Sequence, residues 1–498
     1  MLATRRGGIM IVYPLGRLSS QELTLALPQA TACSFRDQFD ALRNRFRQQP
    51  GLPFLDLLGP RLVADIARQC NHHWRNRIYT PWVTLSLFLS QVLADDQSCT
   101  EAVDRLQKYR ADRGLDPVAT QTGSYCEARN RLPEDLTWEL VRQTGRTIHQ
   151  KAEGSWHFHG RPVKIPDGST VSMPDTKANQ AAYPQQKAQA PGLGFPIARI
   201  LVVFSLAVGT VLEAVLGPYQ GKETGELALL RQVMGQFQPG DIALADRLFG
   251  TYWAIAAWHR RGVDVVTRLH QRRKADFRRG RRLGVDDHVV TWTKPQEIPA
   301  WMSRDEYAAM PATLSLREIR LQVRDKSKRI RTVVLVTTLL DAKVYPAAEI
   351  RALYRQRWHA ELDLRSLKTV MRMEVLRGQS PEMVRKEVAV HLLAYNLIRG
   401  IMAEAARVSA VQPRQLSFKG AQQTIRSFEE VHLYDPRRIK ADLPRLLHLI
   451  GRKRVGKRPD RYEPRAIKRR PKPHRLLQIP RAQARRLMAR GFIIDDKV

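Results

Sequence analysis

Between residues 160 and 269, short apolar segments with strand character alternate with amphipathic segments of helical period. In chain order, the sequence predicts a strand at 163–168, a hairpin at 198–219, a helix at 223–237, a strand at 241–246, a helix at 252–261 and a strand at 263–269. The hairpin is expected to turn at Gly209 and Thr210, which separate two β-branched stretches. Such an alternation favours an α/β core built around a mixed sheet.

The chain departs from this alternation on its C-terminal side. Residues 270–338 are basic and contain short strand-like segments, which predicts a β-rich insertion. Pro346 is expected to open a long helix that runs to about Met373, because proline is tolerated in a first helical turn. A second, strongly apolar helix is predicted at about 381–407. Residues 174–196 are rich in Pro, Gln and Gly, so a loop is expected there.

The first 150 residues have a helical pattern. Two segments match the capping-box motif that starts many helices, Ser98-x-x-Glu101 and Ser124-x-x-Glu127. The second is expected to open a short arginine-bearing helix that ends before Pro133. Two closely spaced helices of this kind are compatible with a helix-turn-helix DNA reader, and equally with a plain helical bundle.

The charge balance points to a polyanionic partner. The 498 residues contain 83 Lys and Arg against 48 Asp and Glu, a formal net charge of +35. This argues against a small-metabolite enzyme of ordinary charge balance. Residues 271–282, 351–372 and 451–475 have net charges of +6, +4 and +10, so more than half of the excess is concentrated in three stretches. The last stretch lies in a tail, from 410 onward, that is rich in Pro and Arg.

Cysteine spacing and hydropathy exclude several classes of protein. No CxxC pair is present, so a zinc ribbon is not expected and reduced cysteines are. The longest apolar runs, near 83–94 and 200–212, are shorter than the ~20 residues of a membrane-spanning helix. The apolar stretch Ile9–Leu15 is soon interrupted by Arg17, so an export signal is not expected. We therefore expect a cytoplasmic protein. The four cysteines are Cys33, Cys70, Cys99 and Cys126.

Two aspartates close predicted strands. Asp167 and Asp246 each follow an apolar run and precede a turn. A carboxylate at the end of a buried strand is costly unless it has a partner or faces solvent. Either residue taken alone is accounted for as the cap of a following loop.

The predicted helix at 346–373 adds a third acid. Tyr354, Arg357, Glu361 and Lys368 are spaced by three, four and seven residues, which places them within about 60° of one another on a helix. Arg365 lies on the same stripe. One interpretation is a solvated face with ion pairs worth only ~0.3–0.5 kcal/mol each. The other joins Glu361 to the two aspartates, because phosphodiester cleavage uses carboxylates to hold two divalent cations ~3.5–4 Å apart.

The stripe resembles a known signature. Its four residues match the YREK motif of the DDE transposases in the insertion-sequence group called IS-four. The segment Asp167–Thr170 is similar to the first-Asp region of that family, and Ala245–Arg247 is similar to the second. The resemblance extends over about 160–410.

The resemblance implies a ribonuclease-H-like catalytic core. On this basis the core spans 151–269 and 339–409, with the β-rich insertion of 270–338 between its two parts. A helical domain of 1–150, a candidate DNA-binding domain, precedes the core, and a basic region of 410–498 follows it.

The resemblance also implies residue roles. Asp167, Asp246 and Glu361 would form a catalytic triad that holds two Mg²⁺ ions, with Mn²⁺ as a substitute. Tyr354, Arg357 and Lys368 would contact the terminal phosphates and a flipped base near the cut. The other implied DNA contacts are Arg247, Arg268 and Arg365. The chain departs from the family where a relative carries a stacking Trp, since Val333 stands nearby here. Trp292 and Trp301 are the alternatives within the insertion.

The implied function is cut-and-paste DNA transposition through a hairpinned transposon end. Water attacks the phosphate at the end of the element, and the freed 3′-hydroxyl attacks the opposite strand and later the target. The expected partners are double-stranded DNA, as terminal inverted repeats and target, and a second copy of the chain in a homodimeric synaptic complex. No membrane is involved, and a nucleoid-associated cytoplasmic protein is expected. The alternatives are a non-catalytic DNA-binding repressor derived from a transposase and another ribonuclease-H-like metal nuclease.

Overall fold

The computed structural model describes residues 58–75, 77–111, 114–324, 330–434, 439–456 and 478–490. Cys33, the apolar stretch Ile9–Leu15 and most of the basic stretch 451–475 lie outside these residues. In the described part no helix is long and apolar enough to cross a membrane.

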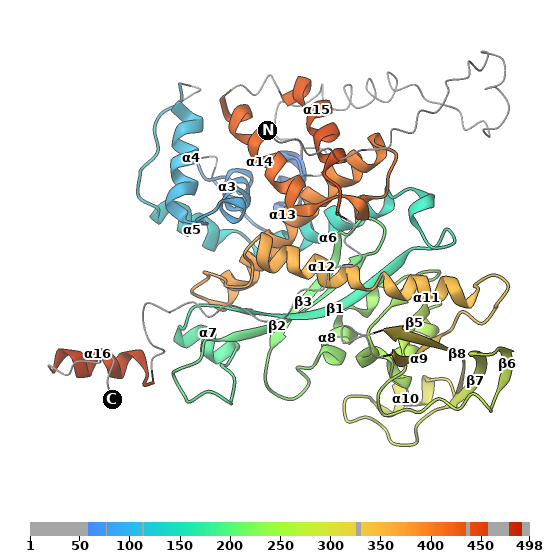
Figure 1. Ribbon diagram of the computed structural model, residues 1–498. Coiled ribbons are helices and arrows are strands. Elements are labelled where there is room, and N and C mark those ends of the chain that lie inside the picture. The colour runs from blue at the N-terminus through green and yellow to red at the C-terminus, as the bar shows by residue number, and fades with distance from the viewer. Residues whose placement is uncertain are drawn as a thin grey trace, which may run out of the picture. The chain divides into compact units, whose positions relative to one another are not determined.

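The described strands form one sheet of nine, in the order β3-β2-β1-β4-β5-β9-β8-β7-β6 (Figure 1). The strands are β1 (Val163–Ser172), β2 (Ile197–Ser205), β3 (Val211–Pro218), β4 (Ile242–Leu244), β5 (Asp264–Arg268), β6 (Arg281–Gly284), β7 (Asp287–Thr293), β8 (Thr313–Arg324) and β9 (Ile330–Thr337). β1 pairs in parallel with β4, and β4 with β5, whereas all the other pairs are antiparallel. The predicted mixed sheet is therefore confirmed.

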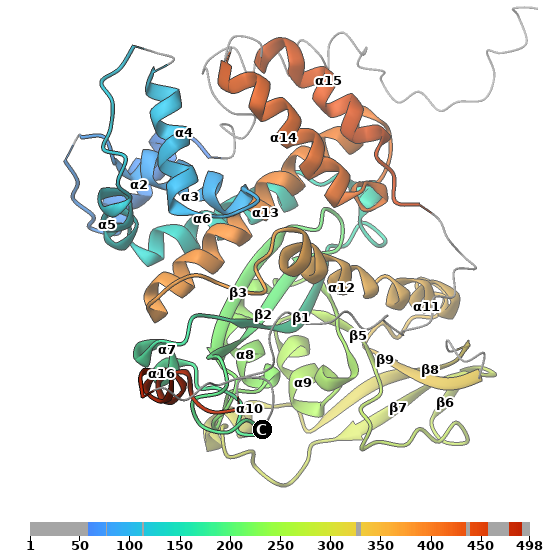
Figure 2. The same ribbon diagram turned by 60° about the vertical axis from the view of Figure 1, so that its left-hand side comes forward.

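Helices cover both faces of the sheet. α8 (Glu226–Val233) and α9 (Tyr252–Arg260) lie on one face, and α11 (Ala347–Arg355) and α12 (Trp358–Arg365) lie on the other (Figures 1 and 2). The first face is closed by an apolar core of strand residues and the buried sides of α8 and α9, including the fully buried Trp258. Removing this apolar surface from water is the main force that holds the layers together.

The strands of the predicted insertion continue the same sheet. β9 pairs directly with β5 through Val266↔Thr337 and its neighbours, and β8, β7 and β6 follow it outward. A short helix, α10 (Arg304–Ala309), starts with a complete capping box made by Ser303 and Glu306. The segment 270–338 is thus rich in strand, as predicted. Its last strand, β9, is hydrogen-bonded to the core strand β5, so the segment extends the core sheet.

The long helix predicted over 346–373 is divided into three parts. α11 and α12 are separated by Gln356 and Arg357, and a π-helical turn, η4 (Ser366–Val370), follows α12. Backbone bonds to carbonyls three residues back tighten the first junction, while the π-turn loosens the second. The prediction of a single continuous helix was therefore wrong in detail. The stripe from Tyr354 to Lys368 does not follow one regular helical period.

The apolar helix predicted at about 381–407 is present, and the predicted loop 174–196 contains a short helix. The apolar helix α13 (Pro381–Val408) has Pro381 in its first turn and Ser380 as its N-cap. It packs against α6 (Glu134–Gln150). Within the predicted loop 174–196 a short helix, α7 (Lys177–Ala182), forms because Thr176 caps it.

The described N-terminal part is helical, as predicted. It contains α2 (Pro60–Gln69), α3 (Pro81–Leu93), α4 (Cys99–Ala111) and α5 (Gly123–Arg131). The Ser98 hydroxyl accepts from the Glu101 N–H, so that cap forms. The second box was wrong, because α5 begins at Gly123, two residues earlier than a Ser124 cap predicts, and Ser124 lies inside the helix. The tail also contains helices: α14 (Phe418–Tyr434), α15 (Ile439–Arg452) and α16 (Arg481–Ala489).

Candidate functional site

Asp167 lies in the middle of β1 and not at its end. The strand continues to Ser172, and Asp167 stands opposite Val202 of β2. The predicted strand end was wrong because Gly168 is absorbed into the ladder with Leu201 and makes no turn. The carboxylate accepts a hydrogen bond of 3.1 Å from the Gly168 N–H. Burial raises the pKa of Asp167 to about 6, against the opposing charge of Arg357, and the charges of Glu226 and Glu361 raise it further.

Asp246 follows β4, as predicted. Its side chain caps the 3₁₀ turn η3 (Arg247–Phe249) by accepting from the Leu248 N–H, and the hydroxyl of the buried Thr267 donates to its carbonyl at 2.8 Å. The β1–β4 ladder is short and pairs only Val163 and Lys164 with the start of β4. The two strands are therefore no longer paired at the level of the two aspartates.

Glu361 reaches this region from α12, which packs against β1. Its carboxylate accepts a hydrogen bond of 2.6 Å from the Arg357 guanidinium, one helical turn earlier. Burial alone would lower the pKa of Arg357, but the bond to Glu361 and the charges of Tyr354 and Asp167 raise it. Arg357 is therefore a shared cation between the Asp167 and Glu361 carboxylates.

Tyr354 links this group to Asp246. Burial raises the pKa of the Tyr354 hydroxyl, with Arg357 opposing; Asp246 raises it further and Arg268 lowers it. Arg268 is the last residue of β5, as predicted. The structure thus brings Asp167, Asp246 and Glu361 into one electrostatic neighbourhood with Tyr354, Arg357 and Arg268.

The other predicted DNA contacts are less closely associated with the three acids. Lys368 lies in the π-helical turn and forms an ion pair of 3.6 Å with Glu374. Arg247 follows Asp246 directly and is exposed, and Arg365 is exposed at the end of α12. In the described residues, no hydrogen bond or ion pair joins these three side chains to Asp167, Asp246 or Glu361.

A fourth acid was missed by the sequence analysis. Glu226 lies in the first turn of α8, on the opposite face of the sheet from α12. Its Cδ atom would be 2.5 Å from a Cβ at Gly168, so the absence of a side chain there makes room for it. Burial raises the pKa of Glu226, with the Arg199 guanidinium at 3.4 Å opposing and Asp246 raising it further. The only signal in the sequence was an acid at the predicted start of an amphipathic helix.

The donor set suits a hard divalent cation, although the side chains do not converge on one point. In the described residues, no three Asp, Glu, His or Cys side chains stand at coordinating positions. Each acid is instead held by a protein donor: Arg357 for Glu361, the Leu248 N–H for Asp246 and the Gly168 N–H for Asp167. Carboxylate oxygens are the ligands that Mg²⁺ prefers. Burial is the main cause of the raised pKa of Asp167, and a cation bound beside this carboxylate would stabilise its charged form.

The aromatic alternatives for stacking on a base are occupied. Trp292 is buried, with the Arg273 guanidinium 3.8 Å from its ring centroid and its indole N–H directed at Glu318. Trp301 is more exposed but has the Arg231 guanidinium 4.1 Å from its ring centroid. Val333 lies in β9 and is nearly buried.

Comparison with known proteins connects this geometry to a family. The family model described as "Transposase DDE domain" matches residues 158–397. The transposase InsG for insertion sequence element IS4 of Escherichia coli (strain K12) is 28% identical over 351 residues, which are 69% of this chain and 76% of that protein. The transposase for insertion sequence element IS421 of Escherichia coli is 35% identical over 69 residues, 14% of this chain and 19% of that protein.

A solved structure of the piggyBac transposase synaptic complex with hairpin DNA covers 85% of this chain and 87% of its own, at 10% identity and a TM-score of 0.37. The family model spans β1, which carries Asp167, the end of β4, which Asp246 follows, and α12, which carries Glu361. With the IS4 relationship, it shows that this chain belongs to the DDE transposases of the IS4 family, enzymes that cleave and transfer DNA strands.

Proposed function

We propose that Asp167, Asp246 and Glu361 are the catalytic acids of this transposase, acting in cut-and-paste transposition of an insertion sequence. The observation that supports this most directly is the raised pKa of Asp167, which reflects burial and nearby carboxylates around one shared arginine. A buried carboxyl group perturbed by specific charged neighbours is a frequent mark of a functional site.

The same carboxylates would hold divalent cations, Mg²⁺ with Mn²⁺ as a substitute. When bound, such ions activate an attacking oxygen and stabilise a leaving oxygen at phosphorus. The chain supplies the positioning. Arg357 holds the Glu361 carboxylate in place at 2.6 Å, and the η3 turn fixes Asp246 at the end of β4.

The surrounding cations would bind the DNA backbone. Arg268 and Arg357 lie beside the acids, where they would neutralise phosphates flanking the cut, and Tyr354 would help to fix the strand end. The exposed side chains of Arg247 and Arg365, with the partly buried Lys368, would extend these contacts outward. Positioning and charge neutralisation are the main sources of rate enhancement in reactions of this type.

The proposal carries four further parts. The core of 151–269 and 339–409 is ribonuclease-H-like, in keeping with a mixed sheet covered by helices on both faces. The helical N-terminal domain (1–150), the β-rich insertion (270–338) and the basic C-terminal region (410–498) complete the chain. Its substrates are terminal inverted repeats and target DNA, bound by a homodimer. The protein works at the nucleoid, in keeping with its charge of +35.

The test is strand cleavage on DNA that carries the element's own ends, identified as inverted repeats flanking the gene. Asp167→Asn and Glu361→Gln should each reduce Mg²⁺-dependent cleavage by about 1,000-fold or more, or ~4 kcal/mol of activation free energy, while DNA binding is retained. Asp305→Asn, an exposed acid of α10, is the matched control and should cleave normally. Full cleavage by both triad variants would refute the assignment, and binding without cleavage by the wild type would indicate a repressor.

A further inference from the structure

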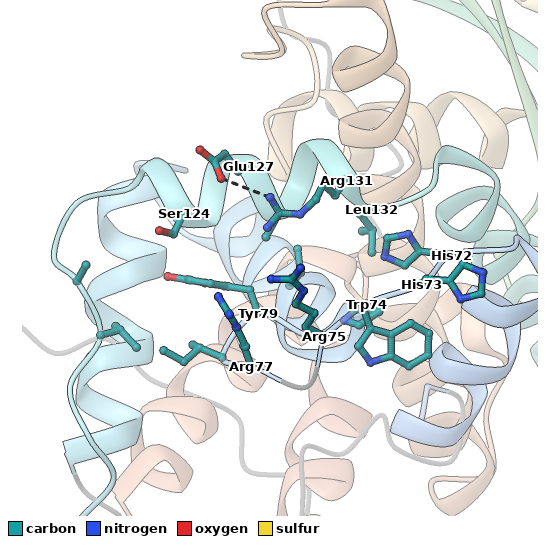
Figure 3. Close-up of a pocket in the computed structure, with 16 residues that line it drawn as sticks. His72, His73, Trp74, Arg75, Arg77, Tyr79, Ser124, Glu127, Arg131 and Leu132 are labelled. Carbon is teal, nitrogen blue, oxygen red and sulfur yellow. Dashed lines mark hydrogen bonds and ion pairs between the residues drawn. The ribbon is translucent and has the colours of Figure 1, made fainter.

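A pocket lies among the N-terminal helices. It has a volume of about 620 Å³, within the ~300–1,000 Å³ range of pockets that hold small ligands. Its walls are residues 72–75 and 77–79, residues 118–119, the start of α3 and one side of α5 (Figure 3). None of its lining residues belongs to the acidic site described above. The proposed catalytic mechanism therefore does not account for this pocket.

The lining of this pocket is cationic. Among the charged residues that border it are three arginines, Arg75, Arg77 and Arg131, and one acid, Glu127. Residues 58–132 as a whole contain ten Lys and Arg and eight Asp and Glu, a net charge of +2. The pocket alone has the same net charge of +2, so the charges of the rest of this region cancel. The positive charge is thus concentrated in the pocket.

Its arginines are available to a ligand. Arg75 and Arg77 are exposed and form no ion pair with any residue in the described ranges. Arg131 has only an exposed partner, Glu127 at 3.3 Å. Figure 3 shows the guanidinium groups of Arg75 and Arg131 directed toward each other across the pocket. Two guanidiniums placed in this way repel each other unless an anion lies between them.

The electrostatic field in the pocket has the same sign. Burial lowers the pKa of His72, and the nearby charges of His73, Arg131 and Lys386 lower it further. The guanidinium fork is well matched to phosphate oxygens. A phosphate group is therefore the anion that this lining suits.

Aromatic rings lie beside the arginines. The rings of His72 and Trp74 are nearly parallel, with centroids 6.1 Å apart and planes at 21°. The Tyr79 ring lies on the other side of Arg75 and Arg77, near Ser124 (Figure 3). Partly exposed aromatic rings beside phosphate-binding cations are the elements that proteins use to bind single-stranded nucleic acid.

We propose that this pocket binds one nucleotide unit of a DNA strand, with its phosphate between Arg75, Arg77 and Arg131 and its base against Trp74. The proposal rests on the proposed function in one respect, namely that DNA is the substrate of this chain. It assigns to the N-terminal helices a contact that is separate from the acidic site and does not depend on divalent ions.

The first test measures binding of the full chain to a single-stranded oligothymidylate in EDTA over a range of salt concentrations. The slope of log K against log salt is negative, and each lost phosphate contact reduces its magnitude by about 0.7. The double variant Arg75→Ala with Arg77→Ala should therefore reduce the magnitude by about 1.4. The charge-matched control is Arg61→Ala with Arg304→Ala, two exposed arginines outside the pocket. A change no larger than that of the control would overturn the proposal.

The second test locates the contact. Oligonucleotides carrying 5-iododeoxyuridine should photocrosslink to Trp74 or Tyr79, and Trp74→Ala should reduce the yield several-fold. Crosslinks confined to other segments would overturn the proposal, as would displacement by thymidine monophosphate at concentrations where unlabelled DNA does not compete. Because both tests omit Mg²⁺, the proposal of nucleotide binding in the pocket can be refuted while the wild type still cleaves DNA. Equally, the pocket can be confirmed while triad variants refute the catalytic assignment.

Discussion

Helix α12 carries two acids, Glu361 and Asp363, that lie two residues apart and have opposite surroundings. The Asp363 side chain is fully buried and accepts from Arg414 at 2.7 and 2.8 Å, and also from Arg399. The Glu361 side chain is 38% exposed and has Arg357 as its cation. One helix therefore contributes to two charged clusters of different composition.

The difference lies in how far each negative charge is compensated. Two guanidiniums neutralise Asp363, and Arg414 also donates to carbonyls of Ser205 and Leu206, which ties α12 to the β2–β3 hairpin. Around Glu361, four acids share two close cations, Arg357 and Arg199, and burial raises the pKa of Asp167 and Glu226. A fully compensated buried cluster is costly to break, because removing one partner leaves an unpaired charge, whereas an undercompensated cluster can bind a cation.

The strongest test of this comparison replaces each of the two acids, one at a time, by an uncharged residue. Asp363→Ala should cost about 3–5 kcal/mol of unfolding free energy, because it leaves two buried guanidiniums without their carboxylate. Glu361→Gln should change stability by no more than about 0.5 kcal/mol, since the Glu361 side chain is partly solvated. Urea unfolding of both variants measures the difference. Similar losses in the two would show that the clusters do not differ in kind.

The next test uses a mutation that is expected to stabilise the protein, whereas most mutations destabilise it. Asp167 titrates at about 6 in the folded protein against an ordinary 3.8, so folding is favoured when it is protonated and this contribution is lost as pH rises through 6. Asp167→Asn should therefore raise the unfolding free energy at pH 7 by up to about 3 kcal/mol, even though it is expected to reduce cleavage by about 1,000-fold or more. Below pH 4 the gain should vanish. A gain that persists at pH 3.5 would trace to packing and not to charge.

Much of this fold follows from hydrophobic periodicity. The alternation between 160 and 269 predicted the order of strands and helices, because sheet and helix faces must each bury an apolar side. Asp246 was placed correctly just after a strand, and the four-residue spacing of Arg357 and Glu361 predicted the ion pair that they form. These are local patterns, which a sequence records directly.

The rest depends on contacts between distant segments. Asp167 was placed at a strand end because Gly168 is typical of turns, whereas pairing with β2 extends the strand through it. Glu226 enters the site because Gly168 leaves space 58 residues earlier in the chain. The compensation of Asp363 requires Arg399 from α13 and Arg414 from η5 (Pro413–Gln415). No spacing rule within one helix reveals such partners.

Glu226 offers a smaller test of the undercompensated cluster. Glu226→Gln should reduce cleavage by about tenfold, or ~1.4 kcal/mol, and raise the Mg²⁺ concentration that gives half-maximal cleavage, because it removes a negative charge that acts on Asp167 and Asp246. The control is Glu223→Gln, an exposed acid that pairs with Arg231. An unchanged Mg²⁺ dependence in Glu226→Gln would place this acid outside the site.

The most delicate test leaves all four acids in place. Gly168→Ala adds a Cβ that would lie 2.5 Å from the Glu226 Cδ and 2.7 Å from its Oε1, so the carboxylate must move away. The effect on cleavage should be a few-fold, smaller than that of Glu226→Gln, because the negative charge remains nearby. If the effect acts through Glu226, the two changes will not add, and Gly168→Ala will have little further effect in a Glu226→Ala background. Full additivity would instead mean that the added methyl group disturbs β1 at Asp167 itself, since the two residues are adjacent on that strand.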